Sequence, residues 1–238
     1  MSRLLERKLR DACIAGAVLA LLACSVLAPA AENLPRWTVE SIVKQLDHAA
    51  AEFRTLAAEI EHTKFTEVVK DTSVETGQIL VRHDHKMRID IQKPDARTIL
   101  RSGDQLFIFT PKINRVEEYN LGKNRAMVDQ YLLLGFGTKG EELKKNYLLT
   151  VLGEETLDNR NAVLVEMTPK SEKIRRQISK IQMWIDEASW IPVQQKFFET
   201  GGDYFLVHYK NVALNTKIAD AKFKADWPKN ASRIKPRG

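Results

Sequence analysis

The stretch GQILVRHDHKMRIDIQKPDARTILRSGDQLFIFT, residues 77–110, decides the fold. It consists of short runs rich in apolar and β-branched residues, separated by turn-forming sequences such as Ser102-Gly103-Asp104. Closely spaced runs of this kind indicate antiparallel strands joined by hairpins. The strands predicted here are Gly77–Arg82, Lys86–Ile91, Ala96–Arg101 and Gln105–Thr110.

The same pattern extends in both directions along the chain. Further predicted strands are Lys64–Lys70, Arg115–Asn120, Tyr147–Leu152, Ala162–Thr168, Lys180–Ile185, Val193–Glu199, Tyr204–Tyr209 and Lys222–Ala225. Turn sequences such as Asp158-Asn159-Arg160 and Gly201-Gly202-Asp203 lie between them. Short strands at such regular spacing predict a meandering antiparallel sheet, in a mainly β protein with a few helices (α+β).

Two stretches depart from the strand pattern. Apolar residues recur every three or four positions from Val39 to Ile60, which predicts one long amphipathic helix with Thr38 as its N-cap. Such a helix needs an apolar surface to cover, and a curved sheet provides one. The segment Asn124–Asn146 contains an apolar cluster that predicts a second, short helix.

Residues 1–30 have the layout of a secretory signal peptide. A basic segment, Met1–Arg10, precedes an uncharged stretch that ends in Ala28-Pro29-Ala30, a small-x-small cleavage sequence. We therefore expect cleavage after Ala30, with residues 1–30 as the signal peptide and residues 31–238 as one exported domain.

Two alternatives concern the same segment. Both cysteines of the chain, Cys13 and Cys24, lie inside it, and Leu21-Leu22-Ala23-Cys24 has the form of a bacterial lipobox. Acylation of Cys24 would anchor the chain to a membrane as a lipoprotein. An uncharged stretch of this length could also span a bilayer, although Pro29 and the small residues favour cleavage.

Composition and charge narrow the function classes. With 44% hydrophobic and 29% charged residues, the chain is not disordered, collagen-like or a coiled coil. Its net charge of +6 is partly carried by the N-terminal segment and is too small to indicate a nucleic-acid-binding protein.

Motifs that could indicate catalysis or a cofactor lack the context that they need. Residues 135–140 spell G-x-G-x-x-G but follow a predicted helix instead of a strand, so we interpret them as a turn. His83-Asp84-His85 has metal-ligand residue types but no evident third ligand, and we interpret it as a polar hairpin turn. Adjacent glutamates such as Glu117-Glu118 would point to opposite faces of a strand. The sequence predicts no enzyme, cofactor or metal site.

Several motifs, in this order and spacing, resemble the LolA family, the periplasmic carriers of outer-membrane lipoproteins. The resemblance is carried first by residues 77–82 (GQILVR), 87–91 (MRIDI) and 102–111 (SGDQLFIFTP). It continues in residues 184–186 (WID), 190–193 (WIPV) and 220–223 (DAKF) with Pro228, which are similar to the C-terminal part of the broader LolA-like group. The resemblance covers nearly the whole chain after the signal peptide.

The resemblance implies a strongly curved, unclosed β-barrel, covered by the long N-terminal helix and a short helical lid. An apolar cavity between them would hold acyl chains. The residues expected to line it are Met87, Ile89, Ile91, Phe107, Phe109, Trp184 and Phe197. Ile42, Leu46 and Phe53 would face it from the helix, and Tyr131, Leu132, Leu133 and Leu134 would form the lid.

The resemblance also implies the partners and the location. These are acylated lipoproteins or lipids as cargo, an inner-membrane ATP-driven exporter, an outer-membrane acceptor, and a monomeric state in the periplasm. One position departs from the family pattern, because His83 and Asp84 stand where the family has a lid-latching arginine and a proline. Arg82 is the nearest guanidinium and hence the candidate latch, but an offset of one residue reverses its direction on a strand.

Two other functions fit the same pattern. Acylation of Cys24 would favour a lipid-anchored outer-membrane acceptor. A fold of this kind could also serve as an envelope-stress sensor that binds a protein partner.

Overall fold

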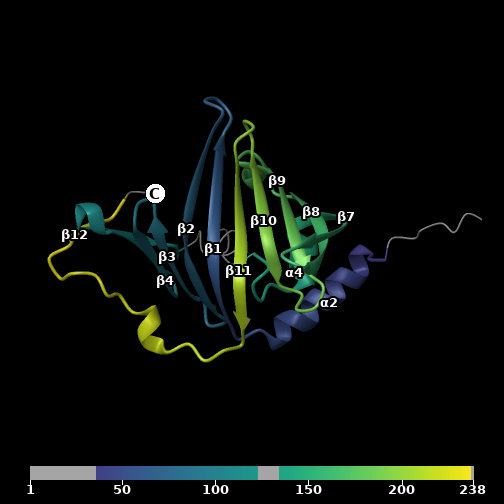
Figure 1. Cartoon of the computed structure of the whole chain (residues 1–238), viewed down its shortest axis with the longest axis horizontal. Helices are drawn as coiled ribbons and strands as arrows, with labels where there is room; N and C mark the ends of the chain where they lie inside the picture. The colour runs from purple at the N-terminus through teal and green to yellow at the C-terminus, as the bar shows by residue number, and fades with distance from the viewer. Residues whose placement is uncertain (1–35, 123–133, 237–238) are drawn as a thin grey trace, which may run out of the picture. The chain divides into compact units, whose positions relative to one another are not determined.

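The computed structural model describes residues 36–122 and 134–236. Within them, one sheet of twelve strands forms the body of the domain (Figure 1). In chain order, the strands are β1 (Thr55–Thr66), β2 (Asp71–Arg82), β3 (Lys86–Lys93), β4 (Arg97–Ser102), β5 (Gln105–Thr110), β6 (Arg115–Asn120), β7 (Tyr147–Leu157), β8 (Arg160–Pro169), β9 (Ile178–Asp186), β10 (Pro192–Glu199), β11 (Tyr204–Leu214) and β12 (Ser232–Ile234). The described helices are α2 (Val39–Glu52), α4 (Gly140–Asn146) and α5 (Glu172–Arg175), with 3-10 turns η1 (Pro111–Ile113) and η3 (Asp220–Phe223).

The strand order across the sheet is β12-β6-β5-β4-β3-β2-β1-β11-β10-β9-β8-β7. Neighbouring strands are antiparallel, except that β12 runs parallel to β6. Strands β12 and β7 lie at the two edges, so the curved sheet is not closed into a barrel. The predicted fold class, a mainly β protein with a curved and unclosed antiparallel sheet, is confirmed.

Side chains alternate between the two faces of the sheet. The inner face carries Leu56, Ile79 and Met87, which pack in one cluster with Phe53 at the end of α2. The same face carries Met183, which packs in a second cluster with Ile42 and Leu46 of α2. We call the opposite side the outer face.

Helix α2 begins as the sequence predicts. The backbone N–H of Ser41 donates to Thr38 Oγ1 at 3.2 Å, and the Thr38 N–H donates to Ser41 Oγ at 2.9 Å, which closes a capping box. Ile42, Val43 and Leu46 are buried on one side of the helix. The apolar stripe therefore faces the sheet.

The prediction that this helix continues to Ile60 is wrong, because it ends at Glu52. Phe53 is already extended, with φ −64° and ψ 128°. The Asn215 side chain donates to the Glu52 carbonyl at 3.2 Å and accepts from the Arg54 N–H at 2.8 Å, which satisfies backbone groups at the helix end. Leu56 and Ile60 then lie in β1, where their spacing fits a strand as well as a helix.

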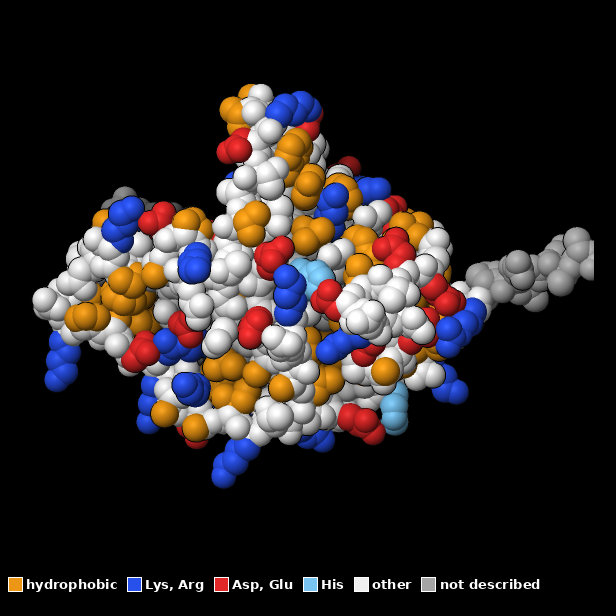
Figure 2. All heavy atoms as spheres, in the orientation of Figure 1, with side chains coloured by type: hydrophobic (Ala, Val, Ile, Leu, Met, Phe, Trp, Pro, Cys, Tyr) orange, Lys and Arg blue, Asp and Glu red, His pale blue; other side chains and the backbone are white. Residues whose placement is uncertain are grey.

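Two predicted strands are also corrected. Strand β1 ends at Thr66, and residues 67–70 form the turn of the β1–β2 hairpin. The tip of this hairpin projects beyond the rest of the sheet in Figure 1, and Figure 2 shows hydrophobic side chains there, where Val68 is 90% and Val69 67% exposed. Residues 222–225 form no strand, since η3 ends at Phe223.

The segment after β11 covers part of the outer face before it reaches β12, the short parallel strand that the sequence did not predict (Figure 1). Arg88 of β3 donates to Asp226 at 2.9 Å. The Trp227 ring lies 5.5 Å from that of Phe107 and 5.9 Å from that of Phe109, between ring centroids. We call residues 215–231 the C-terminal strap.

The G-x-G-x-x-G sequence is a turn that leads into α4, as predicted. Gly137 has φ +72°, a left-handed conformation that favours glycine. A Cβ atom on Gly140 would lie 2.3 Å from the Val43 carbonyl oxygen, so this glycine allows α4 to pack directly against α2. The motif thus serves helix packing.

Some predicted features lie outside the described residues. They are the signal peptide with Ala30 and Cys24, and the lid residues Tyr131, Leu132 and Leu133. Of the predicted lid, only Leu134 is described, and it is 1% exposed. Within the part of the chain that the structure describes, no helix is long and apolar enough to cross a membrane.

Candidate functional site

A cavity of about 200 Å³ lies on the inner face, between strands β1 to β4 and strands β10 and β11. One wall consists of the isoleucines Ile60, Ile79, Ile89, Ile91 and Ile99. The other wall carries Phe197, Phe205 and Val207. We call it the isoleucine cavity.

Strand register explains why these side chains meet. Ile79 of β2 lies opposite Ile89 of β3, and Ile89 lies opposite Ile99 of β4. Directly opposed residues of antiparallel strands point to the same face, so the three form a continuous apolar row. Phe197 and Phe205 close the far side with stacked rings whose centroids are 4.5 Å apart.

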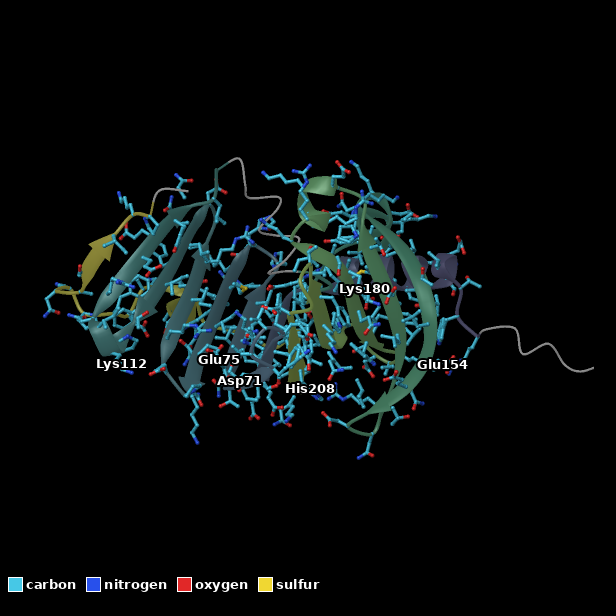
Figure 3. All side chains as sticks on the ribbon, turned by 90° about the horizontal axis from the view of Figure 1, so that it is seen from above. Asp71, Glu75, Lys112, Glu154, Lys180 and His208 are labelled. Carbon is cyan, nitrogen blue, oxygen red and sulfur yellow. The ribbon has the colours of Figure 1, made fainter. Side chains whose placement is uncertain are left out.

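Five side chains with polar groups line the same cavity. Three of them, His62, Glu75 and Arg97, form what we call the ionic cluster, and the other two are Gln195 and Tyr209. Arg97 donates to both carboxylate oxygens of Glu75, each at 2.6 Å. His62 Nδ1 lies 3.0 Å from Glu75 Oε2. Burial by itself would raise the pKa of Glu75, but the hydrogen bonds from Arg97 and His62 outweigh it and lower that pKa. Glu75 is therefore a carboxylate at neutral pH (it is labelled in Figure 3).

A second polar group lies deeper. Tyr209 donates its hydroxyl to Gln195 Oε1 at 2.7 Å, and Gln195 Nε2 donates to the Leu134 carbonyl at 3.0 Å. Burial raises the pKa of Tyr209, so its phenol stays neutral and remains a donor. This chain of hydrogen bonds ties β11 and β10 to the segment that precedes α4.

A smaller cavity of about 180 Å³ lies at the C-terminal end of α2. Phe53, Val81, Leu134, Phe136 and Leu143 supply its apolar lining. We call it the helix cavity. It differs from the isoleucine cavity because helical and loop residues form much of its wall.

The predicted site residues divide among these places. Ile89, Ile91 and Phe197 line the isoleucine cavity, and Phe53 and Leu134 line the helix cavity. Ile42 and Leu46 lie in the packed core with strands β8 and β9. Met87 is 0% exposed and also belongs to packed core. Met87 and Ile89 are two residues apart on β3 and point to the same face, as predicted, but Met87 lines neither of the two cavities.

Three predicted lining residues lie on the outer face, so their assignment to the inner cavity is wrong. Phe107 and Phe109 pack with Leu100 and Val116 beneath the C-terminal strap. Trp184 packs with Leu164 and Val193, and its Nε1 donates to Glu155 at 2.7 Å. All three are apolar enough for a cavity, but strand alternation points them away from it.

Arg82, the candidate latch, contacts residues of the C-terminal strap. Its Nε and Nη2 donate to Asp84 at 2.8 and 2.9 Å, and its Nη1 donates to Asp220 at 2.6 Å. The guanidinium lies 5.0 Å above the Phe223 ring. Hydrogen bonds from Arg82 lower the pKa of Asp84 to about 2, which keeps this contact ionic. His83 and His85 form the β2–β3 turn, as predicted.

Sequence reasoning missed the ionic cluster. The predicted strands began at Lys64 and Gly77, after His62 and Glu75. Extending the alternation Leu56-Ala58-Ile60 by one step places His62 on the inner face, and extending Ile79-Gly77 places Glu75 there. Within residues 36–122 and 134–236, no group of acidic, histidine and cysteine side chains is arranged to hold a metal ion.

Relatives in sequence cover most of the chain. The family model "Outer membrane lipoprotein carrier protein LolA" matches residues 51–226. An outer-membrane lipoprotein carrier protein of Dechloromonas aromatica is 24% identical over 206 residues, which are 84% of this chain and 91% of that protein. An uncharacterized protein of Methanocaldococcus jannaschii is 21% identical over 192 residues, which are 81% of this chain and 52% of that protein. The chain thus spans about half the length of the second relative.

Solved structures give the same fold. An uncharacterized conserved protein from Thermus thermophilus matches with a TM-score of 0.56 at 10% identity, over 84% of this chain and 100% of that one. MucB matches with a TM-score of 0.52 at 14% identity, over 79% of this chain and 62% of that one. At these identities the likeness concerns the fold alone. Since the family model spans well over half of a chain with the predicted unclosed sheet, this protein belongs to the LolA family of outer membrane lipoprotein carrier proteins.

Proposed function

We propose that the protein is an exported carrier that binds the acyl chains of lipoproteins or lipids and ferries them toward the outer membrane. The observation that carries this proposal is the isoleucine cavity, an apolar space on the inner face of the sheet in a member of this family. Each methylene transferred from water into such a space contributes about 0.8 kcal/mol. A few methylenes give reversible binding, which suits a carrier that must release its cargo.

The size of the cavity constrains how cargo would enter. At about 200 Å³, it is smaller than the roughly 300–1,000 Å³ of typical ligand pockets. A complete acyl chain would therefore require the cavity to widen. The partly exposed walls of Ile89, Ile99, Phe205 and Val207 are the places where it can do so without opening the packed core.

A carrier of this kind needs no catalytic group. Its partners would be acylated lipoproteins or lipids, an inner-membrane ATP-driven exporter that supplies them, and an outer-membrane acceptor. Location in the periplasm would follow from cleavage after Ala30.

Native mass spectrometry of the protein purified from the periplasm tests this function. We expect mass adducts of acyl-containing lipids or lipoproteins that disappear after detergent extraction. A matched release assay would mix the protein with membranes that hold a radiolabelled acylated lipoprotein and measure the soluble fraction. A protein that carries no adduct and releases no lipoprotein would contradict the proposal.

The lipobox motif favours one alternative, a membrane-anchored acceptor. Intact-mass measurement of the protein isolated from bacterial envelopes decides between the two. A chain that begins at Ala31 supports a carrier, whereas a diacylated or triacylated Cys24 at the N-terminus would support the acceptor.

A further inference from the structure

An ionic cluster inside an apolar cavity is an unusual combination. His62, Glu75 and Arg97 come from three strands, β1, β2 and β4, yet they line the same cavity as the five isoleucines. Their side chains are 26%, 18% and 32% exposed, respectively. They are thus sheltered from bulk water but remain within reach of a ligand that enters the cavity.

The cluster still has hydrogen-bond donors to offer. A guanidinium carries five N–H groups, and Arg97 uses one on Nη1 and one on Nη2 to hold Glu75. Among the residues that the structure describes, the other N–H groups of Arg97 have no hydrogen-bond partner, so they can reach an acceptor on a ligand. The Glu75 carboxylate, in contrast, can only accept hydrogen bonds, and it already accepts them from Arg97 and His62.

Charge decides which acceptor is suitable. Because Glu75 compensates Arg97 at hydrogen-bond distance, the pair has no net charge. A ligand carboxylate next to Arg97 would also meet the Glu75 carboxylate, and the repulsion offsets much of the attraction. It would also lose its hydration. An ester or amide carbonyl accepts the same N–H groups without the repulsion and with a much smaller loss of hydration.

We propose that the ionic cluster is a specificity filter that selects acyl ligands with uncharged ester or amide heads over free fatty acids of the same chain length. This inference rests on the proposed function, because it assumes that acyl chains occupy the isoleucine cavity. Glu75 is the discriminating residue, and Arg97 supplies the hydrogen bonds.

The test compares two ligands of equal chain length, palmitic acid and 1-palmitoylglycerol, on the full exported chain at neutral pH. Displacement of the uncharged dye Nile red gives a Kd for each. The quantity of interest is the ratio of the Kd for the acid to the Kd for the glycerol ester. We expect a ratio well above one for the wild type.

Two substitutions should move this ratio in opposite directions. Glu75→Gln keeps the shape but leaves Arg97 uncompensated, so the ratio should fall by at least roughly tenfold. Arg97→Gln leaves the Glu75 carboxylate uncompensated, so the ratio should rise. If one variant fails to fold, the direction of the other still decides the matter.

The matched control is Glu61→Gln, one residue before His62 on β1. Glu61 accepts from Lys210 at 3.0 Å in an ion pair on the outer face, so its loss should leave the ratio unchanged. A ratio that is the same in Glu75→Gln, Arg97→Gln and wild type, or that moves in one direction in both variants, would overturn the filter while leaving the carrier function intact. Failure of both ligands to displace the dye from the wild type would contradict the carrier function itself.

Discussion

The two halves of the inner face start from the same strand pattern and end in different structures. On strands β7 to β9, the inward side chains meet Ile42 and Leu46 of α2 together with Leu134 and Leu143, and the cluster is closely packed. On strands β1 to β4, the inward isoleucines surround a cavity of about 200 Å³. In Figure 3, the label Glu75 marks β2 of the cavity half, and the labels Lys180 and Glu154 mark strands β9 and β7 of the packed half.

This difference shows that alternation makes a face apolar but does not fill it. Filling depends on which element covers the face. Helix α2 packs over β8 and β9 and, through Gly140, closely against α4, whereas it ends at Glu52, near the start of β1. The candidate site is thus the part of the inner face that α2 does not fill.

The largest effect is expected for Met87→Glu. Met87 is 0% exposed in packed core, so a carboxylate there would lose its hydration and the apolar contacts of the methionine. This should cost about 3 kcal/mol of unfolding free energy, which the facing Arg101 of β4 would offset only in part. Urea unfolding measures it. Met87→Leu, which conserves volume, should lose less than about 1.5 kcal/mol. Wild-type stability in the glutamate variant would show that Met87 reaches water and belongs to a cavity.

The second largest loss of stability is expected for Leu46→Ala, in the packed half. Leu46 is 3% exposed on α2, and truncation of a buried leucine costs about 2–5 kcal/mol. Acyl affinity of the folded variant should remain that of wild type, because Leu46 lines neither cavity. Lys44→Ala on the exposed side of the same helix should change stability by less than about 0.5 kcal/mol. Lost acyl binding in a folded Leu46→Ala protein would argue that α2 contributes to the site.

The cavity half should show the opposite behaviour in Ile89→Glu. Ile89 lies two residues from Met87 on the same face but lines the cavity and is half-buried. The new carboxylate can keep its water, so the melting temperature should change little while acyl affinity falls by roughly tenfold or more. Dye displacement and thermal melting are measured together, with Ile89→Leu as the apolar control. A large loss of stability without loss of affinity would place Ile89 in the packed core.

The smallest effect concerns the pH dependence of stability. The pKa of Glu75 is lowered from 4.5 in the folded state, so its contribution to stability is present above pH 4.5 and is lost as pH falls through the lowered pKa. Urea unfolding at pH 7 and at pH 3 should therefore show a smaller acid-induced loss for Glu75→Gln than for wild type. Equal losses in the two proteins would mean that Arg97 and His62 do not stabilise the carboxylate. Glu61→Gln provides the reference for a more exposed, ion-paired carboxylate on the outer face.

The sequence by itself determined the strand-rich architecture and the start of the helix. Period-two runs placed most of the strands, since half-buried strands must alternate. Thr38 marked the first turn of α2 because its hydroxyl can cap an unpaired N–H. The resemblance of residues 77–111 to the LolA family predicted both the family and the unclosed sheet.

Only the tertiary structure decided where the helix ends and which side of the sheet holds the cavity. Asn215, more than 150 residues away, satisfies the backbone groups at Glu52 and Arg54, and local spacing carries no trace of that contact. Alternation shows that Phe107 and Phe109 share a face, but both faces of this sheet are covered, one by α2 and the other by the C-terminal strap. Apolar residues are therefore needed on both sides, and only the packing of distant segments separates core from cavity.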